Sequence, residues 1–165
     1  PCEWGTAPLQ VVKYAKDLFE NGDRHKKIQS RAFEQVYAVF DRDDHDSYFE
    51  ALTQAASLDN KLRNDLKQPV RFKAIASVPS FELWLLLHYE DIQAPIHRDE
   101  VMHQLKQYLP DYQKGASNAF ATTKGLLGTA TQRARTLATR YDANNGFDPY
   151  TAIADLVTRL TTLRS

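Results

Sequence analysis

The sequence has little cysteine and no excess of charge. Cys2 is the only cysteine in 165 residues, which excludes an intramolecular disulfide and a zinc site built on cysteines. Lysine plus arginine number 21, as do aspartate plus glutamate, so the formal net charge is zero. Any nucleic-acid partner must therefore be held by a local patch and not by an overall basic field. So little cysteine is typical of a reducing compartment, and we expect a cytoplasmic location.

Long apolar runs and several familiar motifs are also missing. No stretch approaches the roughly 20 apolar residues that span a bilayer, so we expect no membrane partner. The most apolar stretch, residues 81–89, is interrupted by Glu82 and His88. The five histidines show no H-E-x-x-H spacing, and neither a P-loop nor a G-x-G-x-x-G is present. Nothing in the sequence therefore argues for nucleotide hydrolysis or dinucleotide binding.

Two β-prone segments separated by helical segments indicate an α/β fold. Residues 36–40 and 70–76 are the expected strands, whereas residues 8–20, 46–60 and 81–91 space their apolar residues as helices do. The order strand, helix, strand, helix favours parallel pairing of the strands. Consecutive apolar residues in the first strand predict that both faces of the sheet are covered by helices.

The remainder of the chain is expected to be helical. Residues 97–109, 118–141 and 148–163 carry apolar residues at helical spacing, and Gly125 and Gly128 are positions where the second helix could break. Its alanine-rich sequence could pack against a second copy of the chain, as a homodimer. No linker or repeat is evident, so we expect a single domain.

A cluster of acids directly follows the first expected strand. If the chain stays extended, Asp41 and Asp43 face the same side, at the sheet edge where α/β proteins bind ligands. Two such carboxylates repel each other unless a cation, a proton or Arg42 intervenes, and Mg²⁺ prefers oxygen ligands. Acids are equally common in solvated loops, and Asp44 or Asp46 could simply cap the next helix. The residues alone leave both interpretations open.

Glu82 opens an otherwise apolar segment after the second expected strand. The helix dipole favours an acid at this position, which is a purely structural explanation. A carboxylate among large apolar side chains is nevertheless costly unless it is paired. The preceding strand would bring Glu82 to the same edge as Asp41 and Asp43, so we expect three carboxylates to converge. His88 is expected to be a packed or hydrogen-bonded histidine.

Lysines and one further histidine complete the candidates. Lys114 or Lys124 could stabilise negative charge that develops on a phosphate, although each is also an ordinary surface lysine. His45 follows the acids directly and could touch a metal or a phosphate, or simply stand at a helix start.

Two segments resemble the RloB-like family, which is close to the AbiLii abortive-infection proteins. Residues 39–45 (V-F-D-R-D-D-H) and 77–91 (S-V-P-S-F-E-L-W-L-L-L-H-Y-E-D) match a strand ending in D-R-D-x-H and then S-N-P-x-F-E-L-W-L-L-L-H-F. Further matches are G-T-A-P at residues 5–8 and Tyr112-x-Lys114. Val78 stands where the family usually has asparagine. The resemblance covers nearly the whole chain.

The RloB-like family in turn resembles Toprim domains, the metal-binding α/β fold of topoisomerases, primases and OLD-family nucleases. The resemblance implies a Toprim-like parallel sheet flanked by helices, with a helical C-terminal half. The D-x-D of that pattern corresponds to Asp41 and Asp43, the S-x-E to Ser80 and Glu82, and the lysine to Lys114. The family's first glutamate lies in an upstream segment that would precede Pro1. The chain is therefore expected to lack one strand and one metal ligand.

The resemblance implies cleavage of nucleic-acid phosphodiesters in bacterial defence against phage or foreign DNA. Mg²⁺ or Mn²⁺ would be held by Asp41, Asp43 and Glu82, and Lys114 would complete the catalytic set. The accessory residues would be His45, Ser80 and His88. The expected partners are DNA, or tRNA and other RNA, and a partner protein of the defence system.

Two other interpretations remain open. A phosphotransferase or phosphatase of the haloacid-dehalogenase type also has a strand that ends in D-x-D, with Asp41 as nucleophile and Asp43 as acid/base. Glu82 has no natural place in such a site. The second alternative is a non-catalytic adaptor or sensor in a defence complex, which zero net charge and the missing glutamate favour.

Overall fold

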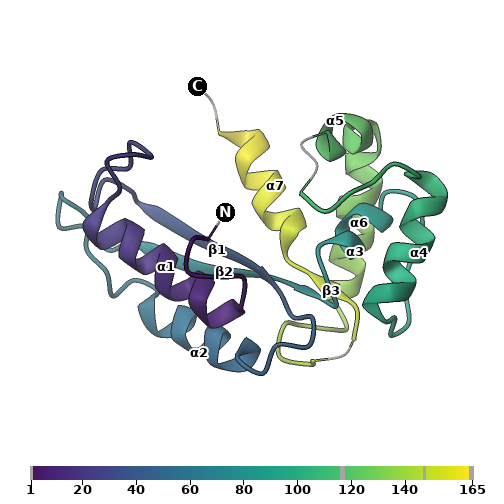
Figure 1. Ribbon diagram of the computed structural model, residues 1–165, viewed down its shortest axis with the longest axis horizontal. Coiled ribbons are helices and arrows are strands. Elements are labelled where there is room, and N and C mark those ends of the chain that lie inside the picture. Colours follow the sequence, from purple (N-terminus) through teal and green to yellow (C-terminus); the bar gives the residue numbers. More distant parts are fainter. Residues whose placement is uncertain (1, 116–117, 147, 164–165) are drawn as a thin grey trace. The chain divides into compact units, whose positions relative to one another are not determined.

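The computed structural model describes residues 2–115, 118–146 and 148–163 (Figure 1). By its internal contacts the chain divides into two compact units. The first unit comprises residues 1–40 and 44–75, and the second comprises residues 41–43 and 76–165. The upstream segment that the family resemblance implies lies outside the described residues.

Two helices and most of two strands form the first unit. Helices α1 (Pro8–Asn21) and α2 (Tyr48–Leu58) pack against each other, as Figure 1 shows, and confirm the two helices expected there. Proline is favoured in the first turn of α1 because its missing N–H would have no partner there. The helix ends at Gly22, whose φ of 70° places it in the left-handed region that glycine tolerates.

Aromatic and aliphatic side chains fill the core of the first unit. Phe40 and Tyr48 are buried, and their rings meet edge to face with centroids 6.0 Å apart. This geometry suits the charge distribution of aromatic rings. Val12 from α1 and Phe72 from the second strand are also buried. The last residue of the first strand before the acids is therefore anchored in a packed core.

The strands form one three-stranded sheet in the order β1-β2-β3. Strands β1 (Gln35–Asp41) and β2 (Arg71–Val78) pair in parallel, with hydrogen bonds from Arg71 N to Glu34 O and from Arg42 N to Ser77 O. The expected parallel pair is thus confirmed. Strand β3 (Tyr150–Thr151) is antiparallel to β2. The expectation that residues 148–163 are helical throughout is wrong at β3.

The first strand is not covered evenly on both faces. Ala38 and Phe40 are buried, whereas the side chain between them, Val39, is 43% exposed. Burial alternates here, as it does in a strand with one covered face. The expectation that helices cover both faces is therefore wrong at this strand.

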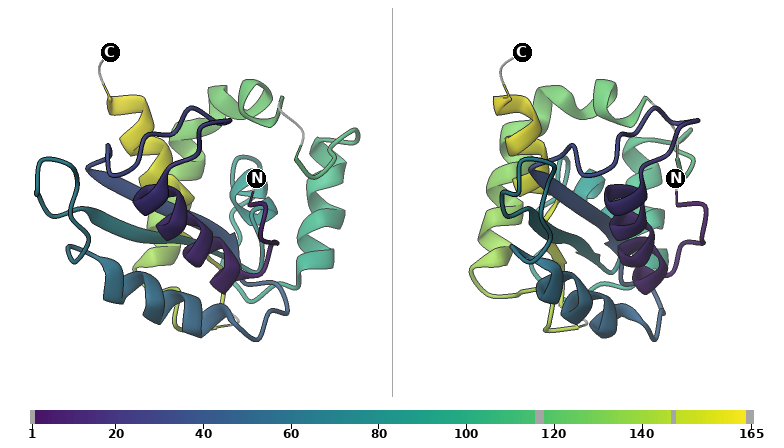
Figure 2. Two further views of the ribbon diagram at one scale, coloured as in Figure 1. Left: turned by 60° about the vertical axis from the view of Figure 1, so that its left-hand side comes forward. Right: turned by 90° about the vertical axis from the view of Figure 1, so that its left-hand side faces the viewer.

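Helices make up most of the second unit, which confirms the helical C-terminal half. They are α3 (Glu82–Leu86), α4 (Arg98–Tyr108), α5 (Ala119–Thr123), the short 3₁₀ helix η1 (Lys124–Leu126), α6 (Leu127–Ala138) and α7 (Ile153–Thr162). Helix α3 packs against α4 and α6 (Figure 2). Its apolar residues are buried and form part of the core of this unit.

Two expected helices of this unit are shorter than their apolar patterns predicted. The segment at 118–141 is interrupted by η1, which contains Gly125, and the segment at 81–91 is regular only over α3. Within the described ranges, no helix has the length and apolar character needed to cross a membrane.

Candidate functional site

Backbone hydrogen bonds within the second unit hold the end of β1 against the turn that follows β2. Arg42 N donates to Ser77 O, and Asp43 N donates to Pro79 O, both at 2.9 Å. Because parallel strands end at the same edge, this pairing places the acids after β1 beside the start of α3. Asp41, Asp43 and Glu82 all belong to this compact unit.

The surroundings of Asp41, the last residue of β1, disfavour the charged form of its carboxyl group. Burial, together with the nearby carboxylates of Glu82 and Asp43, raises the pKa of this carboxyl from the usual 3.8 to about 7. Lys114 and a hydrogen bond from the backbone N–H of Phe81 act in the opposite direction. Repulsion among carboxylates with incomplete compensation is the condition in which a cation or a proton binds.

Asp43 is oriented differently from the sequence expectation. Its φ of 41° lies in the left-handed region, so the chain does not stay extended past Asp41, and the argument from strand alternation fails here. The Oδ1 atom of Asp43 lies 3.5 Å from Nη1 of Arg98, the first residue of α4. That oxygen is buried and has no hydrogen-bond partner in the described part of the chain. Arg98 therefore partly balances the charge of Asp43, although no hydrogen bond joins the two side chains through this oxygen.

Glu82 is the most buried of the three acids, with a side chain only 4% exposed. Tyr112 donates its hydroxyl to Glu82 Oε1 at 3.0 Å. The ammonium group of Lys114 lies 3.8 Å from Oε2, and the Lys114 side chain is 61% exposed. Burying a carboxylate is costly unless it is paired, and these two residues from the segment after α4 supply the pairing. Burial, together with Glu82, raises the pKa of Tyr112, which stays a hydroxyl donor at neutral pH.

The donor chemistry of these acids fits a hard divalent cation that keeps much of its water. Carboxylate oxygens are the ligands that Mg²⁺ and Mn²⁺ take, and Asp43 Oδ1 is a buried acceptor without a hydrogen-bond partner among the described residues. Within the described ranges, no three His, Cys, Asp or Glu side chains form a ready-made metal site. Mg²⁺ is usually bound through only one or two protein carboxylates, together with waters and substrate phosphates.

The three expected accessory residues, His45, Ser80 and His88, lie in three different parts of the structure. Ser80 is buried, and its carbonyl accepts a hydrogen bond from Leu83 N at the start of α3. His45 belongs to the first unit, where its carbonyl accepts from Tyr48 N at the start of α2. The other, His88, is buried in the core, and its Nδ1 lies 3.0 Å from the carbonyl oxygen of Trp84.

His88 has a structural environment, as the sequence predicted. A carbonyl can only accept, so Nδ1 carries the proton in this hydrogen bond. Burial lowers the pKa of the ring, which packs edge-on against Trp84. Its charged neighbour is Arg133, which donates to the carbonyl of Leu87. This packing ties the segment after α3 to α6 and supports the helix that begins at Glu82.

Sequence reasoning missed two residues that contact the acids. Tyr112 was visible only as a match of the family pattern two residues before Lys114, and Arg98 had no local signal. Both contacts depend on where α4 ends and begins in space, which local sequence does not specify. Lys124, the alternative lysine, stands in the short 3₁₀ helix, and the structure gives it no contact with the acids in the described ranges.

Replacing Tyr112 by phenylalanine should destabilise the protein by about 1–3 kcal/mol, because Glu82 Oε1 would lose its donor while remaining buried. Urea unfolding at neutral pH measures the change. Tyr108→Phe is the matched control, because the Tyr108 hydroxyl bonds to Glu90 at the surface. Equal midpoints for the two variants would show that the hydroxyl of Tyr112 does not support Glu82.

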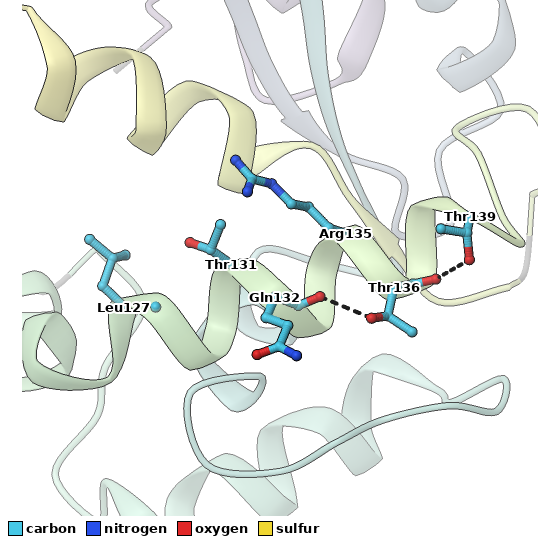
Figure 3. A pocket seen from close by; sticks show the side chains of 7 residues that line it. Leu127, Thr131, Gln132, Arg135, Thr136 and Thr139 are labelled. Carbon is cyan, nitrogen blue, oxygen red and sulfur yellow. Dashed lines mark hydrogen bonds between the residues drawn. The ribbon is translucent and has the colours of Figure 1, made fainter.

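A cavity of about 550 Å³ lies along α6, away from the acids in the sequence. Figure 3 shows its polar lining, in which Thr136 bonds to the carbonyl of Gln132 and Arg135 extends toward α7. Hydroxyl groups that bond back to their own helix leave only modest binding capacity. This cavity brings together none of the residues expected from the sequence.

Comparison with known proteins identifies the family. The model of the RloB-like proteins matches residues 3–160, nearly the whole chain. No curated protein and no solved structure shows significant similarity to it. The matched range includes the end of β1, the start of α3 and the segment with Tyr112 and Lys114. The chain therefore belongs to the RloB-like family.

Proposed function

We propose that this protein is a metal-dependent nuclease that cleaves nucleic-acid phosphodiester bonds. One observation carries the proposal, namely the environment of Asp41. The carboxylates of Glu82 and, to a smaller extent, Asp43 lie near it, its pKa is raised to about 7, and Lys114 is close enough to counteract part of this rise. Strongly perturbed acids at the carboxyl ends of parallel strands are typical of functional sites.

The proposed roles follow from what each side chain can do. Asp41 and Glu82, with Asp43, would hold Mg²⁺ or Mn²⁺ through their oxygens. The bound cation would supply Lewis-acid polarisation of a phosphoryl oxygen and acidify water. Lys114 is exposed and bound only loosely to Glu82, so its ammonium group can turn toward negative charge on a substrate phosphate. Tyr112 keeps Glu82 in one orientation.

Family membership supports a role in defence against phage or foreign DNA, as the family resemblance implied. The substrate would be DNA, or tRNA and other RNA, and a partner protein of the defence system would control when cleavage occurs. A neutral net charge favours local contacts over a general attraction to nucleic acid.

Calorimetric titration of the full-length protein with Mn²⁺ and Mg²⁺ tests the proposal. We expect saturable binding, and cleavage of plasmid DNA or total tRNA that requires the metal and stops when EDTA is added. Cleavage that continues in EDTA would contradict a metal-dependent mechanism. Absence of both metal binding and cleavage would contradict the proposed nuclease function.

The second candidate function is a non-catalytic binding module of a defence complex. It is favoured by one finding, that the described residues hold no ready-made three-ligand metal site. In that case the acids would receive a cationic partner surface in place of a metal. The titration above separates the two functions, because only the nuclease requires a saturable metal site.

A further inference from the structure

We propose that the cavity beside Tyr112 binds an unpaired nucleobase of the substrate. The inference rests on the proposed function and names its substrate class: nucleic acid with a single-stranded, bulged or extruded base next to the cleaved bond. The cavity lies wholly within the second unit and has a volume of about 200 Å³. At about 30 Å³ for each water in the liquid, it has room for several water molecules, or for one flat ring.

Tyr112 belongs both to the cavity and to the candidate site. Tyr112 is one of the residues that line the cavity, and its hydroxyl donates to Glu82 Oε1 at 3.0 Å. A base that touches the Tyr112 ring is therefore one side chain away from the acids. Lys114, two residues further on, lies beside the same carboxylate and can meet the phosphate of the nucleotide. The cavity and the proposed cleavage site thus share one residue, Tyr112.

The walls of the cavity have the chemistry that recognises a base. Its lining residues include the aromatic Tyr108 and Tyr112 and the apolar Leu109 and Pro110, next to one acid, Asp111. One face of the Tyr108 ring is already stacked on Tyr89, with centroids 4.7 Å apart, so this wall is held in place. Proteins bind unpaired bases by stacking them on aromatic side chains, which needs no particular sequence.

Asn118 provides the polar group that such a site needs. It lines the cavity at the start of α5, yet its side chain makes no capping hydrogen bond to that helix. An amide carries both donors and an acceptor, which suits the Watson–Crick edge of a base. Nearby, the Thr122 hydroxyl donates to the carbonyl of Asn118 and keeps its own acceptor capacity. A paired base presents neither a free edge nor a free face, which is why the substrate must be unpaired there.

Oligonucleotide binding tests the inference. Labelled single strands of DNA and of RNA, each with one abasic position moved along the strand, are titrated against the full chain in Ca²⁺, with gels to confirm that they stay intact. We expect wild type to lose about tenfold in affinity at one abasic position, as for the loss of one stacked base. Asn118→Ala and Tyr112→Leu should reduce this discrimination, whereas Tyr112→Phe, which keeps the ring, should retain most of it.

Phe120→Ala is the matched control, because Phe120 lies on the same helix, is 55% exposed and does not line the cavity. Equal affinity for every abasic strand, full discrimination by Asn118→Ala, or no binding of any strand would overturn the inference. Metal-dependent cleavage without base discrimination would support the proposed nuclease function and contradict the base-binding site. Base-dependent binding without metal-dependent cleavage would support the base-binding site and contradict the proposed nuclease function.

Discussion

Replacing Asp41 by asparagine is expected to lower the rate of metal-dependent nucleic-acid cleavage by about 10²–10³-fold, the loss seen when one charge-stabilising group is removed from an active site. Asparagine keeps the shape of the side chain and an oxygen that can accept from Phe81 N–H. It removes the negative charge that would attract the cation. Initial rates of plasmid and tRNA cleavage at saturating Mn²⁺ measure the effect.

Further variants show whether the acids act together. Glu82→Gln should lose activity to a similar extent, and the double variant with Asp41→Asn should be little worse than either single one, since residues that act as a unit are not additive. Lys114→Met should lower the rate of cleavage while leaving Mn²⁺ affinity nearly unchanged. The ammonium group of Lys114 lies near Glu82 but has no lone pair with which to bind a metal. Glu100→Gln, an exposed acid of α4, is the control.

Two outcomes would contradict the assignment. Cleavage that persists in Asp41→Asn would point to another site or to a contaminating nuclease. Trapping of a phosphoaspartate on Asp41 would support the haloacid-dehalogenase alternative, in which this residue is the nucleophile. In that case Glu82→Gln should retain activity, because the alternative gives Glu82 no chemical role.

The same Asp41→Asn replacement is expected to stabilise the metal-free protein by about 4 kcal/mol at pH 8. The pKa of Asp41 is about 7 in the folded protein against 3.8 for an ordinary aspartate, and each pKa unit corresponds to about 1.4 kcal/mol. Below pH 3.8 the carboxyl is protonated in both states and has no penalty. The penalty grows as the pH rises from about 4 and is complete above about 7.

Urea unfolding of both proteins at pH 4 and pH 8, in EDTA, measures this difference. The variant and wild type should agree at pH 4 and diverge at pH 8, and the difference between them removes the contribution of the titrating groups that do not interact with Asp41. Mn²⁺ at pH 8 should stabilise wild type and leave the variant nearly unchanged. Equal stabilities at both pH values would mean that Asp41 ionises freely in the folded chain. Activity and stability moving in opposite directions at one residue is the behaviour of a functional site.

Sequence patterns located most regular elements because their signals are local. The β-prone segments at 36–40 and 70–76 predicted the two parallel strands, and helical spacing predicted α1, α2 and α4 within one or two residues. Strand β3 was not predicted, because a two-residue strand is too short to show an apolar pattern. Tyr150 and Thr151 form a strand only through their pairing with β2. The segment expected as a helix over 118–141 is interrupted at η1, which contains Gly125, one of the two glycines where the sequence indicated a possible break.

The sequence by itself determined the family and the residue types of the candidate site: acids after each parallel strand and a lysine further along. Only the tertiary structure decided their environment. The turn of the chain at Asp43, the burial of Asp41 and the hydroxyl that Tyr112 donates to Glu82 are contacts between distant segments. Such contacts, with the solvent that they exclude, set the pKa of an acid and its orientation, and neither is encoded in its neighbours along the chain.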